Sequence, residues 1–201
     1  MSCNITKGRL RTCKNNIAGI SEIYITKYKP LNRFNSVFKN GVELKMIPDT
    51  LFYKFEVKGL NSSFSESMQV EDAGKHFNTN LTLSLVKLEI ELAEEIESLV
   101  NSVFHIVVKL NNGNYYFLGF ENGLELTSLD INSGVSLADF QGYNLTFTGT
   151  ERYKGMLISD FENSGIKPVF NPVFIWGGNT ENEVISYDNK VIETKQNIWK
   201  I

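Results

Sequence analysis

The chain has few of the residues on which catalysis and metal binding most often depend. Only two histidines, His76 and His105, occur in 201 residues, and neither lies in a recognisable metal-binding or nucleophile motif. The only cysteines, Cys3 and Cys13, have neither a zinc-site spacing nor the spacing of a redox Cys-x-x-Cys pair. No Gly-x-Ser-x-Gly, phosphate-loop or dinucleotide-binding motif is present. We therefore expect no enzymatic activity, no metal site and no cofactor.

The chain also lacks a strong charge of one sign and a long hydrophobic run. Its 20 Lys and Arg nearly balance its 23 Asp and Glu, which gives a formal net charge of -3. Proteins that hold nucleic acid through its phosphates carry clustered basic faces, so we expect no tight electrostatic grip on nucleic acid. No segment approaches the roughly 18 apolar residues of a membrane span, and the N-terminus lacks a signal-peptide run. We expect synthesis in a cytoplasm, unpaired thiols and no membrane partner.

What the sequence does contain is a two-residue alternation of apolar and polar side chains, which is typical of half-buried β-strands. Alternation predicts strands at 20–28, 51–58, 63–70 and 77–85, with a short strand at about 42–47. At 51–58, Leu51, Tyr53, Phe55 and Val57 share the face predicted to be apolar. We expect residues 51–86 to form three antiparallel strands, with a long hairpin protruding from about residue 60 to 76.

The period changes to that of a helix at Lys87. Apolar residues then recur at spacings of three and four up to Val103, which predicts an amphipathic helix of about four turns. Its glutamates are expected to form a solvated face, and a negative helix flank could also meet a basic strip on a neighbouring subunit.

The second half of the chain returns to strands. We expect a hairpin from 104–110 through the Asn-rich turn 111–114 into 115–120, then a short strand at 124–129. A polar loop at 130–141 leads to a strand at 143–150. The tail predicts a C-terminal β-hairpin around 184–187 and 191–194, with apolar anchors at Trp176 and Trp199. We therefore divide the chain into a β domain at 1–153 and a C-terminal extension or arm at 154–201.

Several local motifs resemble those of one class of viral protein. They are the segment Cys3–Cys13 with the following Gly19–Tyr24, the turn Asn111–Asn114, and the stretches Glu121–Glu125 and Gly142–Phe147. Together with the order of predicted elements, they are similar to tail tube and head-to-tail connector ring subunits of tailed bacteriophages. The resemblance is closest to virion proteins of crAss-like and related phages of Bacteroidota. It covers roughly residues 1–153, so the role of 154–201 lies outside it.

The resemblance implies a fold and a function. The fold is mainly β with one α-helix: two packed antiparallel sheets form a tail-tube-like sandwich or barrel, with a long protruding hairpin and a C-terminal β extension. The function is that of a virion structural protein whose copies form a tube or connector ring, six-fold or a multiple of six, through which genomic DNA passes during ejection. Other tail or connector proteins would be its further partners, and the tail or head–tail junction its location.

Two sets of residues are candidates for these roles. Subunit contacts are expected from the protruding hairpin and from the polar loop, in particular from Phe64, Met68, Val70, Asp130 and Asn132. The uncharged strand face formed by Ser63, Ser65, Ser67 and Gln69 is a candidate channel lining, since cations there would bind phosphate and slow DNA. An ordinary solvent-facing strand would have the same composition, so both interpretations stay open.

Two other functions remain alternatives. Exposed aromatic residues and Asn-rich loops would also suit a carbohydrate- or receptor-binding β-sandwich module. An enzyme would require His105 to lie in a pocket beside a carboxylate.

Overall fold

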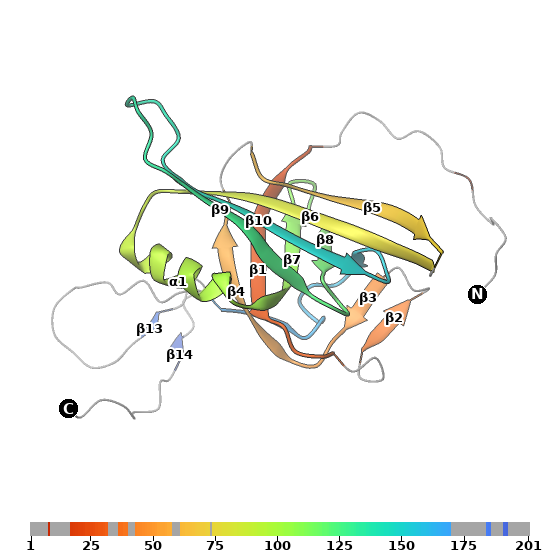
Figure 1. Cartoon of the computed structure of the whole chain (residues 1–201). Coiled ribbons are helices and arrows are strands. Elements are labelled where there is room, and N and C mark those ends of the chain that lie inside the picture. Colours follow the sequence, from red (N-terminus) through yellow and green to blue (C-terminus); the bar gives the residue numbers. More distant parts are fainter. Residues whose placement is uncertain are drawn as a thin grey trace.

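A computed structural model describes residues 8, 17–31, 36–39, 43–57, 61–72, 74–169, 184–185 and 191–192. Within these residues the fold is mainly β with one helix, as predicted (Figure 1). The first strands are β1 (Ile20–Lys27), β2 (Val37–Lys39), β3 (Glu43–Met46), β4 (Thr50–Glu56), β5 (Ser63–Glu71) and β6 (Gly74–Val86). After helix α1 (Ile90–Val100) follow β7 (Val103–Leu110), β8 (Tyr115–Leu118), β9 (Leu124–Asn132), β10 (Gly142–Glu151), β11 (Met156–Ile158), β12 (Ile166–Val169), β13 (Val184–Ile185) and β14 (Val191–Ile192).

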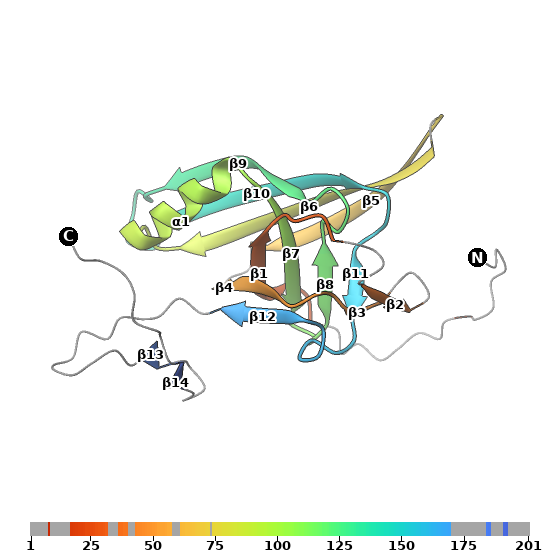
Figure 2. The same ribbon diagram turned by 90° about the horizontal axis from the view of Figure 1, so that it is seen from below.

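Twelve of the strands belong to one hydrogen-bonded sheet that bends into two halves. One half is the four-stranded antiparallel run β5-β6-β10-β9. The other half contains β1, β2, β3, β4, β7, β8, β11 and β12, and the halves join where the first two residues of β7 pair with the start of β9. Figure 2 shows the two halves as separate layers, with α1 at one end.

Two clusters of buried apolar side chains hold this arrangement together. The first core lies between the layers and takes side chains from β1, β6, β7, β10 and α1, among them Ile23, Leu83 and Phe147. The second core lies on the other side of β1, β7 and β8 and includes Phe52 and Phe117. Strands β1 and β7 are therefore buried on both faces, and burial of such apolar area is the main stabilising contribution to the fold.

The alternation in β4 correctly predicts which side chains share a side of the strand, but not which of them are buried. Leu51, Tyr53, Phe55 and Val57 do share a side of the strand, but Leu51 and Tyr53 are 59% and 50% exposed. Phe52, on the opposite side, is fully buried in the second core. The prediction of a single buried face is wrong because both sides of β4 meet apolar clusters and neither is covered along its whole length.

The predicted boundary after residue 153 does not coincide with the end of the sheet. Strand β11 pairs with β8 and, in parallel, with β3, while β12 pairs in parallel with β4. Met156, Ile158 and Ile166 are buried in the second core. The chain up to Val169 is thus integral to the β domain, and two of its pairings are parallel rather than antiparallel.

The short strands β13 and β14 pair antiparallel with each other, as the predicted C-terminal hairpin requires. Trp176 and Trp199 lie outside the described residues.

Two further elements differ in length from the prediction. Helix α1 has 11 residues, about three turns rather than four. Strand β9 continues to Asn132, so Asp130 and Asn132 lie in a strand and not in the polar loop. Each of them pairs with a residue of β10, Asp130 with Asn144 and Asn132 with Gly142.

Candidate functional site

The most distinctive surface is the outer face of the half-sheet β5-β6-β10-β9, which is made almost entirely of uncharged polar side chains. Directly opposed residues on neighbouring strands point to the same side of a sheet, so the strand register shows which residues share the outer face. We call each line of opposed residues across the strands a row. One row joins Ser65, Asn80 and Thr148, and the next joins Ser67, Asn78 and Thr150. Towards the other end, Ser63 continues into Thr82, Thr146 and Ser128. The four strands together contain a single Lys, Lys75, and no Arg.

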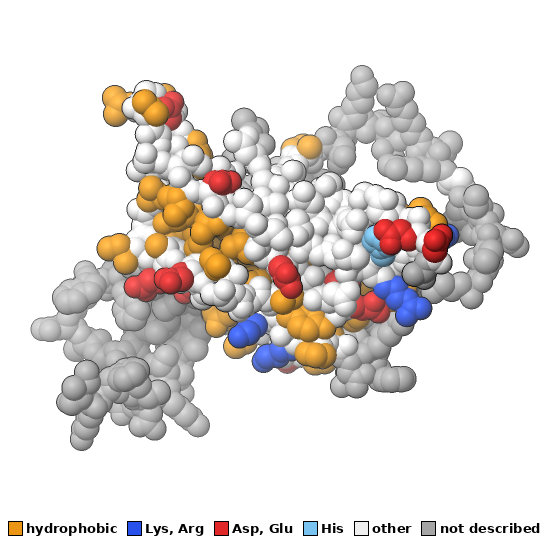
Figure 3. Space-filling view, viewed as in Figure 1, with side chains coloured by type: hydrophobic (Ala, Val, Ile, Leu, Met, Phe, Trp, Pro, Cys, Tyr) orange, Lys and Arg blue, Asp and Glu red, His pale blue; other side chains and the backbone are white. Residues whose placement is uncertain are grey.

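Acidic side chains and one histidine complete this face. Asp130 and Glu125 lie on it through their pairing with Asn144 and Thr148, and His76 lies on it opposite Gln69. Figure 3 shows the same surface as a broad area without Lys or Arg over β5, β6 and β10. The face would therefore repel or ignore a polyanion rather than bind it.

A shallow hollow of 630 Å³ lies on this face. Its lining includes Ser65, Ser67, Asn80, Thr148 and Glu125. These groups donate and accept hydrogen bonds, and no cluster of charged side chains lies among them. The hollow can therefore hold ordered water or a polar solute.

Among the described residues, the half-sheet ends in two open edges. Strand β5 is the terminal strand of the sheet order, and β9 pairs with β7 only at Leu124 and Glu125. Beyond Glu125, no strand of the described chain lies on the outer side of β9. Both edge strands have nine residues. Long open edges are sites where another strand can add, because they present backbone groups without a ladder partner.

The opposite, core-facing side of the half-sheet becomes gradually uncovered towards β9. Leu83 and Leu145 are buried, but Leu129, in the same row, is 36% exposed. In the neighbouring row Tyr143 is buried, whereas Ile131 is 62% exposed. The apolar rows of the first core therefore continue onto the surface at β9. Figure 3 shows hydrophobic side chains gathered at this end of the molecule.

The hairpin of β5 and β6 leaves apolar residues uncovered at the other end of the half-sheet. Met68 and Val70 are 54% and 64% exposed, and they lie on the core-facing side opposite Phe77 and Lys75. Phe64, nearer the base, is half-buried and packs against Tyr116 with ring centroids 5.3 Å apart. Of the three predicted hairpin contacts, Met68 and Val70 are thus accessible, and Phe64 mainly belongs to the fold.

The loop between β9 and β10 presents two fully exposed apolar side chains, Val135 and Leu137. The carboxylate of Asp139 accepts hydrogen bonds from the backbone N–H groups of Val135 and Ser136, at 2.9 and 2.7 Å. These bonds lower the pKa of Asp139 below its ordinary value. The loop is therefore internally braced while its apolar side chains point outward.

The predicted residues fall into two groups in space. Ser63, Ser65, Ser67 and Gln69 share the outer face, and Asp130 and Asn132, predicted as loop contacts, belong to the same face. Met68 and Val70 lie on the reverse side of β5. The prediction missed the rows that β6, β10 and β9 add, because the sequence gives each strand's alternation but not its register.

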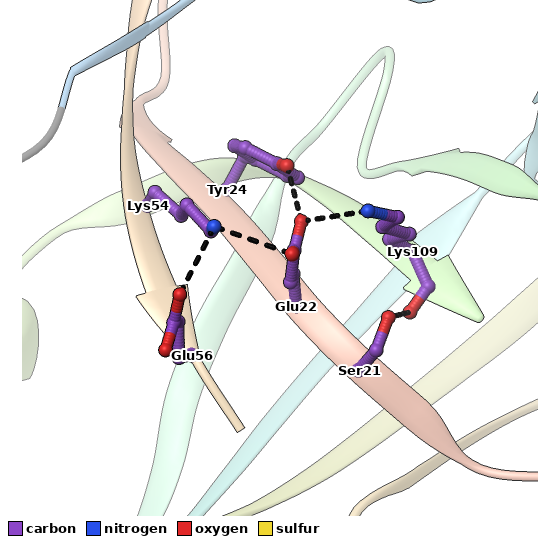
Figure 4. Close-up of polar contacts among 6 residues, drawn as sticks. All are labelled: Ser21, Glu22, Tyr24, Lys54, Glu56 and Lys109. Atoms are coloured by element: carbon purple, nitrogen blue, oxygen red, sulfur yellow. Dashed lines mark hydrogen bonds and ion pairs between the residues drawn. The ribbon is translucent and has the colours of Figure 1, made fainter. Parts of the chain in front are cut away.

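The densest network of charged groups lies elsewhere, across β1, β4 and β7 (Figure 4). The carboxylate of Glu22 accepts a hydrogen bond from the Tyr24 hydroxyl at 2.6 Å and lies 3.2 Å from the Nζ atoms of Lys54 and Lys109. Lys54 also lies 3.2 Å from Glu56, the strand partner of Glu22, and so bridges two carboxylates that face each other.

The pKa shifts in this network follow from its contacts. Burial alone would raise the pKa of Glu22, but hydrogen bonds from Tyr24, Lys109 and Lys54 bring it below its ordinary value. Burial and the neighbouring Glu22 carboxylate raise the pKa of Tyr24 far above its ordinary value. Because every acid here has a base within reach, the network fits a role in joining three strands.

Two buried titratable groups fix the turn between β8 and β9. The Glu151 carboxylate accepts hydrogen bonds from the backbone N–H groups of Glu121, Asn122 and Gly123, at 2.9 to 3.0 Å. Burial raises the pKa of Glu151, and the three hydrogen bonds oppose the rise. At Gly123, where φ is +81°, a Cβ would lie 2.4 Å from Val103, so this turn requires glycine.

His105 lies beside the same turn and is 1% exposed. Its Nδ1 and Nε2 atoms lie 2.6 and 2.8 Å from the backbone carbonyl oxygens of Gly119 and Lys29. Burial lowers the pKa of His105, and the two backbone contacts partly offset this. Both ring nitrogens are thus engaged by the backbone in the interior.

Comparisons with known proteins add no identification: no family model, curated protein or solved structure matches this chain. Among the described residues, no helix is long and apolar enough to cross a membrane. The described part of the chain also holds no group of three or more His, Cys, Asp or Glu side chains placed to bind a metal ion.

Proposed function

We propose that this chain is a virion structural protein of a tailed phage, and that its copies form a tail tube or connector ring through which DNA passes. It would act by assembly rather than catalysis. The single observation that carries the proposal is the half-sheet of the described chain, which has open edges on two strands of equal length and an outer face without Lys or Arg.

The strand directions favour joining of like copies. Neighbouring strands alternate in direction along β5, β6, β10 and β9, so β5 and β9 run in opposite directions. Adding β5 of one copy to β9 of the next therefore continues the antiparallel pattern. Such a head-to-tail contact uses two different surfaces, which generates a closed ring when the rotation between copies allows closure.

The side chains fit the same arrangement. A continuous sheet places all core-facing sides on one side of the ring, so Met68 and Val70 of one copy would lie on the same side as Ile131 of the next. The polar outer faces would then line the central channel. Each phosphate-binding cation in such a channel would retard DNA, and the face offers none.

The experiment is to purify the full chain and image it by negative-stain electron microscopy alongside analytical ultracentrifugation. Rings or tubes are expected, and deletion of residues 62–74, which removes all of β5 and the hairpin tip, should abolish them. Circular dichroism would establish that the deleted chain is still folded. A chain that remains monomeric at high concentration in the presence of phage tail components would contradict the proposal.

The hollow on the outer face favours one second candidate, a carbohydrate- or receptor-binding module. Its hydrogen-bonding groups suit a polyol, although none of the residues lining it is aromatic and able to stack on a sugar ring. Binding of the monomer to a glycan array, with no ring formation, would favour this alternative.

A further inference from the structure

A groove between helix α1 and the end of β4 offers a second docking surface that the ring contact does not use. It has a volume of 240 Å³ and is lined by Tyr53, Phe55 and Glu56 of β4 and by Leu92 and Glu95 on one side of α1. Among the described residues, β12 pairs with β4 only as far as Tyr53, opposite Val169, whereas β4 continues to Glu56. The groove therefore combines a strand edge with partly apolar walls, which suits an added extended segment.

The charges around the groove favour a basic occupant. Helix α1 contains the acids Glu91, Glu94, Glu95 and Glu97 and no Lys or Arg. Glu89 and Glu56 add two carboxylates to the lining. The bases among the described residues here are Lys54, which also lines the groove and lies 3.2 Å from both Glu22 and Glu56, and Lys87, which pairs with Glu89 at 3.3 Å. Acids thus outnumber bases along this side of the molecule.

One segment of this chain has the complementary composition. Residues 1–16 contain Lys7, Arg9, Arg11 and Lys14 and no Asp or Glu, a formal charge of +4 on the side chains. The C-terminal residues 170–201 are the nearest competitor in sequence, but their three Lys are outweighed by four Asp and Glu, a net charge of -1. Charge complementarity therefore selects the N-terminal segment.

The described start of the chain lies on the β7 side of β1. The backbone carbonyls of Ala18 and Gly19 accept hydrogen bonds from the side chain and the backbone of Asn111, at 2.8 and 3.0 Å. Asn111 directly follows β7, which flanks β1 on one side, whereas β4 flanks it on the other. The chain thus enters β1 along its β7 side, while Ser21 of β1 accepts a hydrogen bond from Val57, next to Glu56 of the groove. The proposed assembly supplies a second such groove on a neighbouring copy, and we take that copy as the partner.

We infer that residues 1–16 of one copy bind in the α1–β4 groove of a neighbouring copy as an added strand. In an extended segment Lys7, Arg9 and Arg11 lie on one side, where they would face the carboxylates of Glu89 and Glu95. The inference rests on the proposed assembly of like copies, because it requires a neighbour. It adds a contact that ties copies together independently of the β5 and β9 edges.

Disulfide trapping in the full chain tests this directly. Cys13 is the natural probe, Cys3→Ser removes the only other cysteine, and Glu95→Cys places the partner thiol at the groove. Oxidation should give covalent dimers and longer ladders on a non-reducing gel. The matched control Ser159→Cys, at an exposed position between β11 and β12, should give far less cross-linking. Monomers with an internal disulfide, or equal yields from both variants, would overturn the inference.

A charge exchange provides the second arm of the test. Lys7→Glu with Arg9→Glu should lower the cross-linking yield roughly tenfold, as expected for a few partly exposed ion pairs. Because Glu95 carries the thiol, Glu89→Lys, at the other acid of the α1 side of the groove, should restore part of the yield in that background. Failure to restore it would contradict the pairing of these charges.

Electron microscopy of the same samples separates the two hypotheses. Rings without groove cross-links would overturn the arm contact and leave the ring proposal standing. Specific cross-links in a chain that forms only irregular oligomers would overturn the ring and keep the contact.

Discussion

At the scale of single residues, the turn between β8 and β9 depends on two buried side chains that contact its backbone. Glu151 accepts three of its N–H groups, and His105 contacts the carbonyl of Gly119. This turn precedes β9, the strand whose open edge carries the proposed assembly. Stability at these two residues is therefore coupled to the geometry of the assembly surface.

Replacing Glu151 tests the contribution of the carboxylate. Glu151→Ala should reduce the free energy of unfolding by about 3 kcal/mol, because it leaves one buried and two partly buried backbone donors without an acceptor. Glu151→Gln should cost less, since its carbonyl oxygen can still accept up to two hydrogen bonds. Urea denaturation followed by circular dichroism measures both. Equal stability of all three proteins would show that water replaces the carboxylate at no cost.

His105 should make the fold sensitive to mild acid. Its pKa is lowered by burial, so below the ordinary value of 6.5 the unfolded chain binds a proton that the folded chain resists. Stability should therefore fall as the pH drops through about 6.5 and continue falling towards the lower folded-state pKa. Urea denaturation at a series of pH values should show this fall in the parent and a weaker one in His105→Asn. His76→Asn, at a half-exposed position, is the matched control and should retain the dependence.

At the scale of elements, β9 is the strand that pairing with a neighbouring copy would stabilise most. It carries core-facing apolar side chains that are increasingly exposed towards Asn132, and most of one edge has no partner among the described strands. Burying Ile131 and Leu129 against a second copy would remove apolar surface from water while completing the ladder.

A pair of charge substitutions on β9 separates assembly from folding. Ile131→Asp should weaken self-association at least tenfold but change the free energy of unfolding of the monomer by only about 0.5 kcal/mol, because the side chain is already largely exposed. Ser128→Asp introduces the same charge on the opposite side of the strand and should leave the edge contact intact. Sedimentation velocity over a range of concentrations measures both. Similar association constants for the two variants would exclude the core-facing side of β9 from the contact.

At the scale of the whole molecule, the two sides of the half-sheet suit different environments. The core-facing side contacts the second layer and extends apolar rows to both open edges, whereas the outer side is polar and free of Lys and Arg. Neither the open edges nor the outer face without Lys and Arg contributes to the stability of a monomer. A ring places the first side in the wall and the second in the channel.

Adding cations to the outer face tests the proposed channel. Ser65→Lys, Ser67→Lys and Asn80→Lys together should create binding to duplex DNA that the parent lacks, with an affinity that falls steeply as salt is raised. Fluorescence anisotropy with labelled DNA at low and moderate salt measures the effect. Replacing the same residues with Gln keeps the face uncharged and should give no binding. Parent protein that already binds DNA tightly would contradict an inert lining.

The sequence alone determined the class of fold and most of its elements. The alternation of β5, β6 and β10 and the three- and four-residue spacing of α1 are local periodicities, and each is set by which side chains can reach a common core. The same periodicity placed Ser63, Ser65, Ser67 and Gln69 on one side of β5. This much of the candidate surface needed no knowledge of any neighbouring strand.

Only the tertiary structure decided which strands meet. It joined β11 and β12 to the sheet beyond the predicted boundary, buried β1 on both sides and left the end of β9 uncovered. It also aligned Asn80 and Thr148 with Ser65 to make one continuous face. The reason is physical: a periodic strand specifies which of its sides is apolar, but its partners and register are set by packing between residues far apart in the chain.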